Sequence, residues 1–310
     1  MKILILGAGG TGGYFGGRLA QAGADVTFLL REKRAAHIAR DGLIIETPTE
    51  RAVVRVQTVL AATVKPEYEV IILACKAYDL ASSIAAIRPA MHHRSQIVPL
   101  LNGLSHLDTL DAAFGSDRVM GGSCQIAVTL TADGVVKNLA EHQTILWGAR
   151  HGDANQVQVA AALGEAFART SVDWRVAADV MQDMWEKFTF LCTLAGMTSL
   201  MRASLGDILA TDDGKQHLQR FFDNCVAVAV AEGRAPRAPV MTRFHGIMHS
   251  QGSTLTASML RDIEAGNEIE AAHIVGDMLA RARHHGIDDT MLSIAHTHLQ
   301  AYQQRRKLAH

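Results

Sequence analysis

The sequence has few cysteines, no long apolar run and almost no net charge, and each absence excludes a class of protein. None of the four cysteines forms a C-x-x-C pair, so neither a zinc knot nor a disulfide framework is indicated, and we expect a reducing cytoplasm. A net charge of −1 gives no global field toward nucleic acid or anionic lipid. The apolar runs are too short to span a bilayer, and glycines interrupt the N-terminal run where a signal peptide needs a continuous core.

The chain is rich in histidine, with 15 of them, which raises the question of a metal site. The candidate pairs are His92–His93, His284–His285 and His296/His298. None has the i, i+4 spacing with an adjacent acid that is typical of a helical zinc site. We therefore expect these pairs to be solvated at the surface, and we expect no metal.

What the chain does have is a glycine-rich start, "KILILGAGGTGG" at residues 2–13. Gly7, Gly9 and Gly12 form G-x-G-x-x-G directly after a strand-like run and before an apolar helical pattern. In a dinucleotide site the first glycine makes a tight turn, the second admits a pyrophosphate and the third lets helix and strand pack. We therefore predict a nucleotide site here rather than a glycine-rich β-turn. Its candidate residues are Gly7, Gly9, Gly10, Thr11 and Gly12.

Residues 1–176 alternate strand-like and helix-like segments, which predicts an α/β, Rossmann-like, doubly wound domain. The strand-like runs include residues 25–30, 68–75 and 95–101, with helical stretches around 77–87 and 104–114. We predict a hairpin-like insertion from residues 42–47 and 51–60, and an antiparallel edge from residues 119–148.

Residues 177–310 predict an all-α domain, because no strand pattern in them is convincing. The segments 179–202, 215–233 and 267–286 carry apolar residues at helical spacing, and Gly233 is placed to end the second of them.

The end of the second predicted strand bears on cofactor choice. An NAD site usually has an acidic residue there, whereas this strand ends in Arg31, with Arg34 three residues on. An arginine suits the 2′-phosphate of NADP. Glu32 could instead face the ribose, or the segment could be a solvated loop.

Three polar residues are placed where chemistry is expected. Lys76 and Asn102 each follow a buried strand, and ligands of open α/β sheets bind at such carboxyl ends. Lys187 lies within the apolar helical segment "MWEKFTFLCTLAG". A lysine among apolar neighbours snorkels, pairs with an acid or serves chemistry.

These residues carry a family resemblance. The segments "ILGAGGTGGYFGGRLAQAG", "LACKAYD", "PLLNG", "WEKFTFL" and "SMLRDIEAGNEIE" resemble ketopantoate reductase (2-dehydropantoate 2-reductase), in the family's order and along nearly the whole chain. The resemblance implies NADPH-dependent reduction of a 2-oxo acid to a 2-hydroxy acid. It implies Lys187 and Glu270 as catalytic residues, Asn102 and Ser258 as substrate ligands, and Lys76 with Asn102 on the cofactor side.

The sequence departs from the family in its substrate half. Two asparagines that follow the catalytic lysine in the family are replaced by Leu191 and Ala195. The nominal substrate is therefore ketopantoate, with two alternatives: a more apolar 2-oxo acid, or a non-catalytic NADPH-binding sensor. The expected partner is a small molecule, with no nucleic acid and no membrane, and a homodimer is plausible.

Overall fold

The computed structural model describes residues 1–309, without the side chains of residues 141 and 309, and it divides into two compact units. The first unit comprises Met1–Leu101 and His106–Met181. The second comprises Asn102–Ser105 and Gln182–His310, so a short segment from the first half of the chain belongs to the helical unit. No described helix is both long and apolar enough to cross a bilayer.

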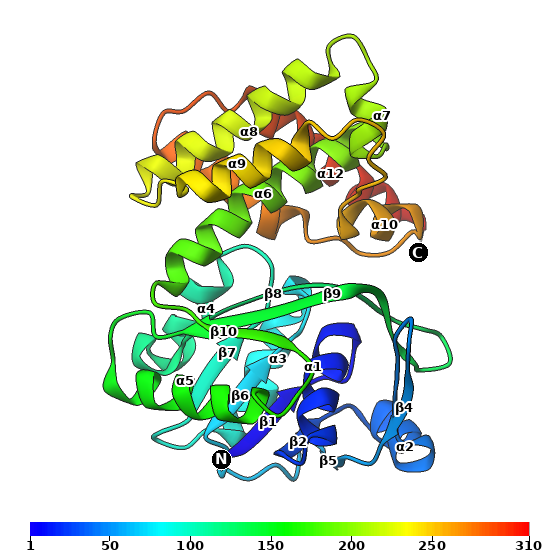
Figure 1. Ribbon diagram of the computed structural model, residues 1–310, viewed down its shortest axis with the longest axis vertical. Coiled ribbons are helices and arrows are strands. Elements are labelled where there is room, and N and C mark those ends of the chain that lie inside the picture. Colours follow the sequence, from blue (N-terminus) through cyan, green and yellow to red (C-terminus); the bar gives the residue numbers. More distant parts are fainter. Residues whose placement is uncertain (310) are drawn as a thin grey trace. The chain divides into compact units, whose positions relative to one another are not determined.

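The first unit is built on a parallel sheet with the strand order β5-β2-β1-β6-β7 (Figure 1). Its strands are β1 (Lys2–Leu6), β2 (Asp25–Leu29), β5 (Gln57–Val59), β6 (Val70–Leu73) and β7 (Gln96–Pro99). Every residue of β6 and β7 is buried, as expected of apolar strands covered on both faces. The helices of this unit are α1 (Gly10–Gln21), α2 (Glu32–Asp41), α3 (Leu80–Ile87), α4 (His106–Phe114) and α5 (Ala154–Phe167). The predicted Rossmann-like sheet is confirmed.

A second sheet corrects two details of the prediction. It has the order β10-β9-β3-β4, with β8 paired to β9. Its strands are β3 (Leu43–Glu46), β4 (Arg51–Val54), β8 (Gly121–Leu130), β9 (Val136–Gly148) and β10 (Asp173–Val176). The expected β3–β4 hairpin is present, but residues 51–60 form two strands, β4 and β5, which belong to different sheets. The antiparallel pair β8–β9 belongs to this second sheet and is not an edge of the first.

Helix α1 packs against both sheets because glycines leave room on two of its faces. A Cβ at Gly16 would lie 2.7 Å from Ile5 and Phe28 of the first sheet. A Cβ at Gly17 would lie 2.5 Å from Ile45 of the second sheet. The glycines of this helix therefore serve the layering of the unit as well as its N-terminal loop.

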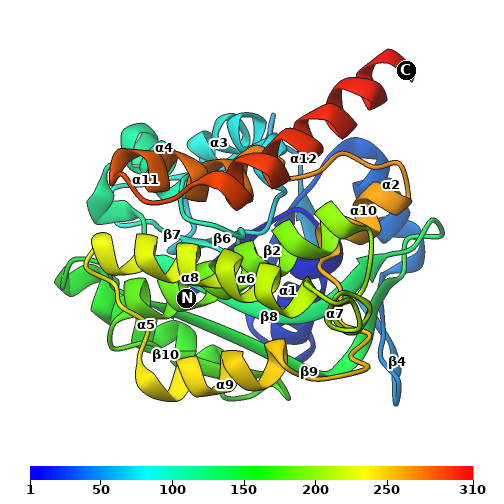
Figure 2. The ribbon, with the colours of Figure 1, turned by 90° about the horizontal axis from the view of Figure 1, so that it is seen from above.

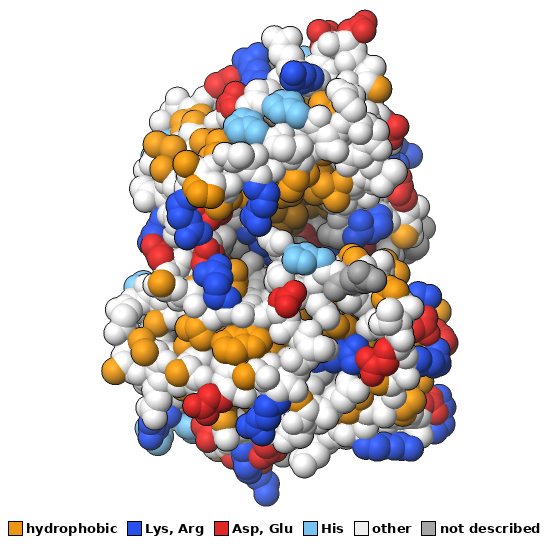
Figure 3. Space-filling model, in the orientation of Figure 1, with side chains coloured by type: hydrophobic (Ala, Val, Ile, Leu, Met, Phe, Trp, Pro, Cys, Tyr) orange, Lys and Arg blue, Asp and Glu red, His pale blue; other side chains and the backbone are white. Residues whose placement is uncertain are grey.

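Strand β10 is an exposed edge. Trp174 and Val176 are 37% and 40% exposed, and Trp174 stacks on the buried Trp147 with ring centroids 6.0 Å apart. Hydrophobic side chains gather over β10 and α5 on the face of this unit seen in Figure 3.

The second unit is all-α over its described residues, as predicted (Figure 2). Its helices are α6 (Val180–Met201), α7 (Leu205–Leu209), α8 (Gly214–Ala231), α9 (Ala238–Met248), α10 (Ser258–Glu264), α11 (Asp277–His284) and α12 (Thr290–Ala309), with a π-helical turn over Ala272–Gly276. Helix α6 packs on α9 through Phe190 and Phe244, whose stacked rings lie 4.7 Å apart. The single helix predicted over residues 267–286 is wrong only in its first four residues: residues 267–270 are not helical, and a π-helical turn leads into α11.

Candidate active site

The glycine loop of the first unit has the geometry that a dinucleotide requires. Gly7 has φ +86°, which makes the turn after β1 and is unfavourable for other residues. A Cβ at Gly12 would lie 2.5 Å from the carbonyl oxygen of Gly7, so only glycine allows this close packing. No atom lies within 4 Å of a Cβ built at Gly9, which leaves its backbone open to a ligand.

The N-terminus of α1 is open in the same way. No side chain caps it, and its first turn contains no acidic residue. Its first N–H groups therefore remain available to an anionic ligand, supported by the helix dipole. The bare backbone at Gly9 and the uncapped helix fit the pyrophosphate of a dinucleotide.

Arg34 contacts this loop, whereas the side chain of Arg31 is exposed to solvent. The Nε of Arg34 donates to the carbonyl of Ala8 at 3.1 Å, and its Nη1 donates to the carbonyl of Gly134 at 2.9 Å. Its Nη2 is buried without a hydrogen-bond partner, and burial lowers the pKa of the guanidinium. Arg31 is 83% exposed and pairs with Asp79 at 3.4 Å. Arg34 is therefore a half-buried cation whose positive charge is left for a ligand to neutralise.

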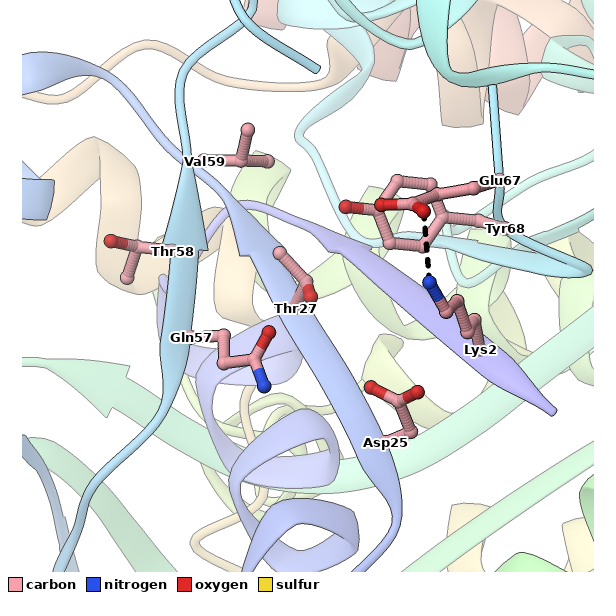
Figure 4. Close-up of a pocket in the computed structure, with 8 residues that line it drawn as sticks. All are labelled: Lys2, Asp25, Thr27, Gln57, Thr58, Val59, Glu67 and Tyr68. Atoms are coloured by element: carbon pink, nitrogen blue, oxygen red, sulfur yellow. Dashed lines mark hydrogen bonds and ion pairs between the residues drawn. The ribbon is translucent and has the colours of Figure 1, made fainter. Parts of the chain in front are cut away.

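Lys76 follows β6 and begins a 3₁₀ turn (Ala77–Asp79), so it stands at the carboxyl end of the sheet as expected. A hollow of about 340 Å³ lies at the opposite end, beside the starts of β1, β2 and β5. It is lined by polar side chains, among them Lys2 and Glu67, which form an ion pair at 2.8 Å (Figure 4). Ligands of open α/β sheets bind at carboxyl ends, so this hollow is not the nucleotide site.

In the second unit, Lys187 meets Asn102. The Nζ of Lys187 donates to Oδ1 of Asn102 at 3.2 Å, although 85 residues separate them in the chain. Asn102 and Lys187 come from the Asn102–Ser105 segment and from α6. Both side chains are half-buried. The amide oxygen fixes the direction of the ammonium group without neutralising its charge, which is what a proton donor needs.

Glu270 is buried, with an exposed fraction of 7%, and it stands just before the π-helical turn. Its charge acts on His273 within that turn.

Three other residues from the sequence analysis lie in the second unit. Ser258 is the first residue of α10 and is half-buried. On α6, Leu191 is half-buried and Ala195 is buried.

Helix α6 is anchored beside Lys187 by a buried acid. Glu186 accepts hydrogen bonds from the backbone N–H and the Nε of Arg237, each at 2.8 Å. Arg237 also binds Asp183. Burial raises the pKa of Glu186, but the hydrogen bonds from Arg237 and Gln182 outweigh it and hold the pKa below its usual range. This cluster fixes the turn of α6 that carries Lys187.

Sequence reasoning missed Arg237, Ser105 and His273. Each contacts a partner far away in the chain, so no local spacing marks it. The one available signal was the motif "EAAHIVG", in which a histidine follows an acid at three residues. Among the described residues, no group of three or more His, Cys, Asp or Glu side chains could hold a metal ion.

Comparison with known proteins identifies the family. Residues 3–152 match the family model of ketopantoate reductase PanE/ApbA, and residues 179–303 match the model of its C-terminal domain. The chain belongs to this family. It is 33% identical over 307 residues to the uncharacterized oxidoreductase YkpB of Bacillus subtilis, covering 99% of this chain and 100% of that one.

A 2-dehydropantoate 2-reductase of Halobacterium salinarum is 26% identical over 289 residues, covering 93% of this chain and 94% of the relative. The ternary structure of D-mandelate dehydrogenase with NADH and anilino(oxo)acetate shares the fold, with a TM-score of 0.87, 19% identity, and coverage of 99% of both chains. The chain is therefore an oxidoreductase of the ketopantoate reductase family.

Proposed function

We propose that this protein reduces a 2-oxo acid to a 2-hydroxy acid with NADPH, nominally ketopantoate to pantoate. The observation that carries the proposal is the hydrogen bond from Lys187 Nζ to Asn102 Oδ1 at 3.2 Å. Bound NADPH would supply a hydride to the carbonyl carbon. Lys187 would supply the proton to the carbonyl oxygen, which balances the reduction and stabilises the negative charge that develops there.

The other residues of the second unit position the substrate in this proposal. Asn102 holds the ammonium group of Lys187 in one direction, and Ser258 donates to a polar group of the substrate. Glu270 accepts a hydrogen bond from the substrate or tunes the charge of its neighbours, since a buried carboxylate acts strongly at short range. We include in the proposal a cytoplasmic location and a homodimer, with a small hydroxy acid as the released product.

The choice of NADPH rests on the two arginines after β2. Arg34 brings an uncompensated, half-buried positive charge next to the glycine loop, and Arg31 adds an exposed one beyond it. A 2′-phosphate would accept charge-assisted hydrogen bonds from such guanidinium groups, whereas the 2′-hydroxyl of NADH would leave Arg34 uncompensated. We include Lys76 on the cofactor side of the site.

The test is oxidation of NADPH and NADH, followed at 340 nm, with a panel of 2-oxo acids that includes ketopantoate. We expect turnover with NADPH on at least one member of the panel. If NADPH binds but no 2-oxo acid is reduced, the protein is the non-catalytic sensor. A preference for NADH would contradict the cofactor assignment.

One observation favours a second candidate, a 2-oxo acid with a more apolar tail. Leu191 and Ala195 lie one turn apart on α6, four and eight residues after Lys187, and neither offers a hydrogen bond to the hydroxyl of ketopantoate. An unmet polar group costs about 1–3 kcal/mol, or roughly 5- to 150-fold in kcat/KM. The D-mandelate dehydrogenase structure, which holds anilino(oxo)acetate, indicates that the fold accommodates such a tail.

This candidate is tested with paired substrates. We expect kcat/KM for ketopantoate to lie below that for 2-oxo acids without the hydroxyl, and Leu191→Asn to raise it about tenfold. Ketopantoate as the best substrate by tenfold, with no gain from Leu191→Asn, would leave ketopantoate reduction as the activity.

A further inference from the structure

His273 holds the segment that carries Asn102. It is half-buried within the π-helical turn, and its Nδ1 lies 2.8 Å from the hydroxyl of Ser105. Burial lowers the pKa of His273, and the charges of Glu270 and Asp277 and a hydrogen bond with the backbone of Asn102 oppose that shift without overcoming it. The ring is therefore neutral at pH 7, and it bonds both ends of the Asn102–Ser105 segment.

The middle of the segment is shaped to fit the same residue. Gly103 has φ +75°, and a Cβ there would lie 2.8 Å from the carbonyl oxygen of His273 and 3.1 Å from its ring. The next residue, Ile274, accepts a weak hydrogen bond at 3.9 Å from the thiol of Cys192 on α6. The π-helical turn thus contacts both the Asn102–Ser105 segment and the helix that bears Lys187.

Two features indicate more than core packing. A π-helical turn is rare and occurs frequently at functional sites. His273 bonds to groups in or near Asn102. The amide oxygen of Asn102 accepts a hydrogen bond from Lys187, the proton donor of the proposed reaction. A displacement of about 1 Å in such a contact can cost a hundredfold in rate.

We propose that His273 is a positioning residue that clamps the Asn102–Ser105 segment and so keeps Asn102 Oδ1 within reach of Lys187 Nζ. The inference rests on the proposed function, because it assigns Lys187 as the proton donor. It adds a residue and a contact that act through Asn102 without touching the substrate.

Three variants separate the contacts. His273→Leu removes both ring hydrogen bonds and puts an apolar side chain of similar size in their place. His273→Asn places an amide near the position of Nδ1 and keeps the bond to Ser105. Ser105→Ala removes the hydroxyl alone. His298→Leu is the matched control, because His298 is a half-buried histidine of the same unit whose Nε2 has no hydrogen-bond partner.

We expect His273→Leu to lower kcat about 10- to 100-fold, with KM for NADPH changed less than twofold. His273→Asn should recover most of that loss, Ser105→Ala should lose about 3- to 10-fold, and His298→Leu should match the wild type. In an Asn102→Ala background, His273→Leu should lower kcat by less than a further threefold, because both changes act on one contact.

A merely structural histidine would lower stability and leave kcat per folded enzyme unchanged, and its effect would add to that of Asn102→Ala. Either result overturns the proposal.

Hydrogen exchange separates this proposal from the proposed function. Backbone exchange of residues 100–106 should be at least tenfold faster in His273→Leu than in the wild type and in His298→Leu. If the wild type reduces no 2-oxo acid, the proposed function fails while this measurement still decides the clamp. Equal exchange rates in the variant and the wild type would overturn it.

Discussion

The glycine loop of the first unit and the Lys187 cluster of the second build their candidate sites in opposite ways. The loop is a single stretch of six residues, Gly7 to Gly12, and it offers the backbone N–H groups of an uncapped helix and the open space at Gly9. The Lys187 cluster offers side chains from three separate segments: α6, the Asn102–Ser105 segment and the stretch from Glu270 to His273. The first site depends on what its residues lack, and the second on what far-separated residues bring together.

The difference predicts different responses to substitution. In the loop, any added atom is harmful, and its effect depends on whether the atom meets the protein or the ligand. In the cluster, harm follows from the loss of a named hydrogen bond, and stability and activity can change independently.

The largest effect is expected at Lys187. Lys187→Met keeps the apolar stem and removes the ammonium group, so kcat should fall by about 10²- to 10⁴-fold while NADPH affinity hardly changes. Steady-state kinetics and NADPH fluorescence titration measure the two quantities. Lys215→Met, at an exposed lysine in α8, is the control. Activity within threefold of the wild type would mean that Lys187 only snorkels, and it would contradict its role as the proton donor.

The same contrast explains how far the sequence could be interpreted. The loop was predictable because its glycines lie within six residues at a fixed spacing, and one of them, Gly12, closely approaches the carbonyl of Gly7. The long helix α6 was predictable from its apolar periodicity. The helix predicted over residues 267–286 begins later than expected, because residues 267–270 are not helical and a π-helical turn interrupts the regular repeat before α11.

The partners within the cluster could not be predicted. The bond between Ser105 and His273 spans 168 residues, and no local pattern encodes a contact at that separation. The same holds for Arg237 and Glu186, which are 51 residues apart. The split of residues 51–60 between two sheets was also hidden, because it depends on pairing with β3 for one strand and with β2 for the other, which the local sequence does not encode.

Two glycine substitutions sharpen the description of the loop. Gly9→Ala adds a methyl group where no protein atom lies within 4 Å, so the melting temperature should hold while NADPH affinity falls about 100-fold. Gly12→Ala forces a methyl group to 2.5 Å from the Gly7 carbonyl and should destabilise the fold by about 1–3 kcal/mol. Calorimetry and NADPH titration separate the outcomes. Full NADPH affinity in Gly9→Ala would remove the pyrophosphate from this loop.

The two arginines after β2 test whether side chains beside the glycine loop bind the cofactor. If the half-buried guanidinium binds the 2′-phosphate, Arg34→Ala should weaken NADPH binding roughly 5- to 150-fold and leave NADH nearly unchanged. Arg31→Ala should act in the same direction but less, because Arg31 is exposed and shared with Asp79. Binding of both cofactors is measured by fluorescence titration. Equal losses for NADPH and NADH in both variants would contradict a 2′-phosphate site.

The smallest effect on turnover is expected at Arg237, which separates support from chemistry in the cluster. Arg237→Met leaves the buried Glu186 without its main partner, and the cost should be about 2 kcal/mol of unfolding free energy, discounted because the arginine is half exposed.

Because the pKa of Glu186 is lowered in the folded protein, its contribution is present above the unfolded pKa of about 4.3 and is lost as pH falls through the folded value. The gap between variant and wild type should therefore be full at pH 7 and shrink below about pH 4. Denaturant unfolding at pH 7, 5 and 3 measures the gap, and kcat of the folded variant should stay within about twofold of the wild type. A variant as stable as the wild type at pH 7 would show that α6 is held by its apolar contacts alone and that this ion pair adds nothing to it.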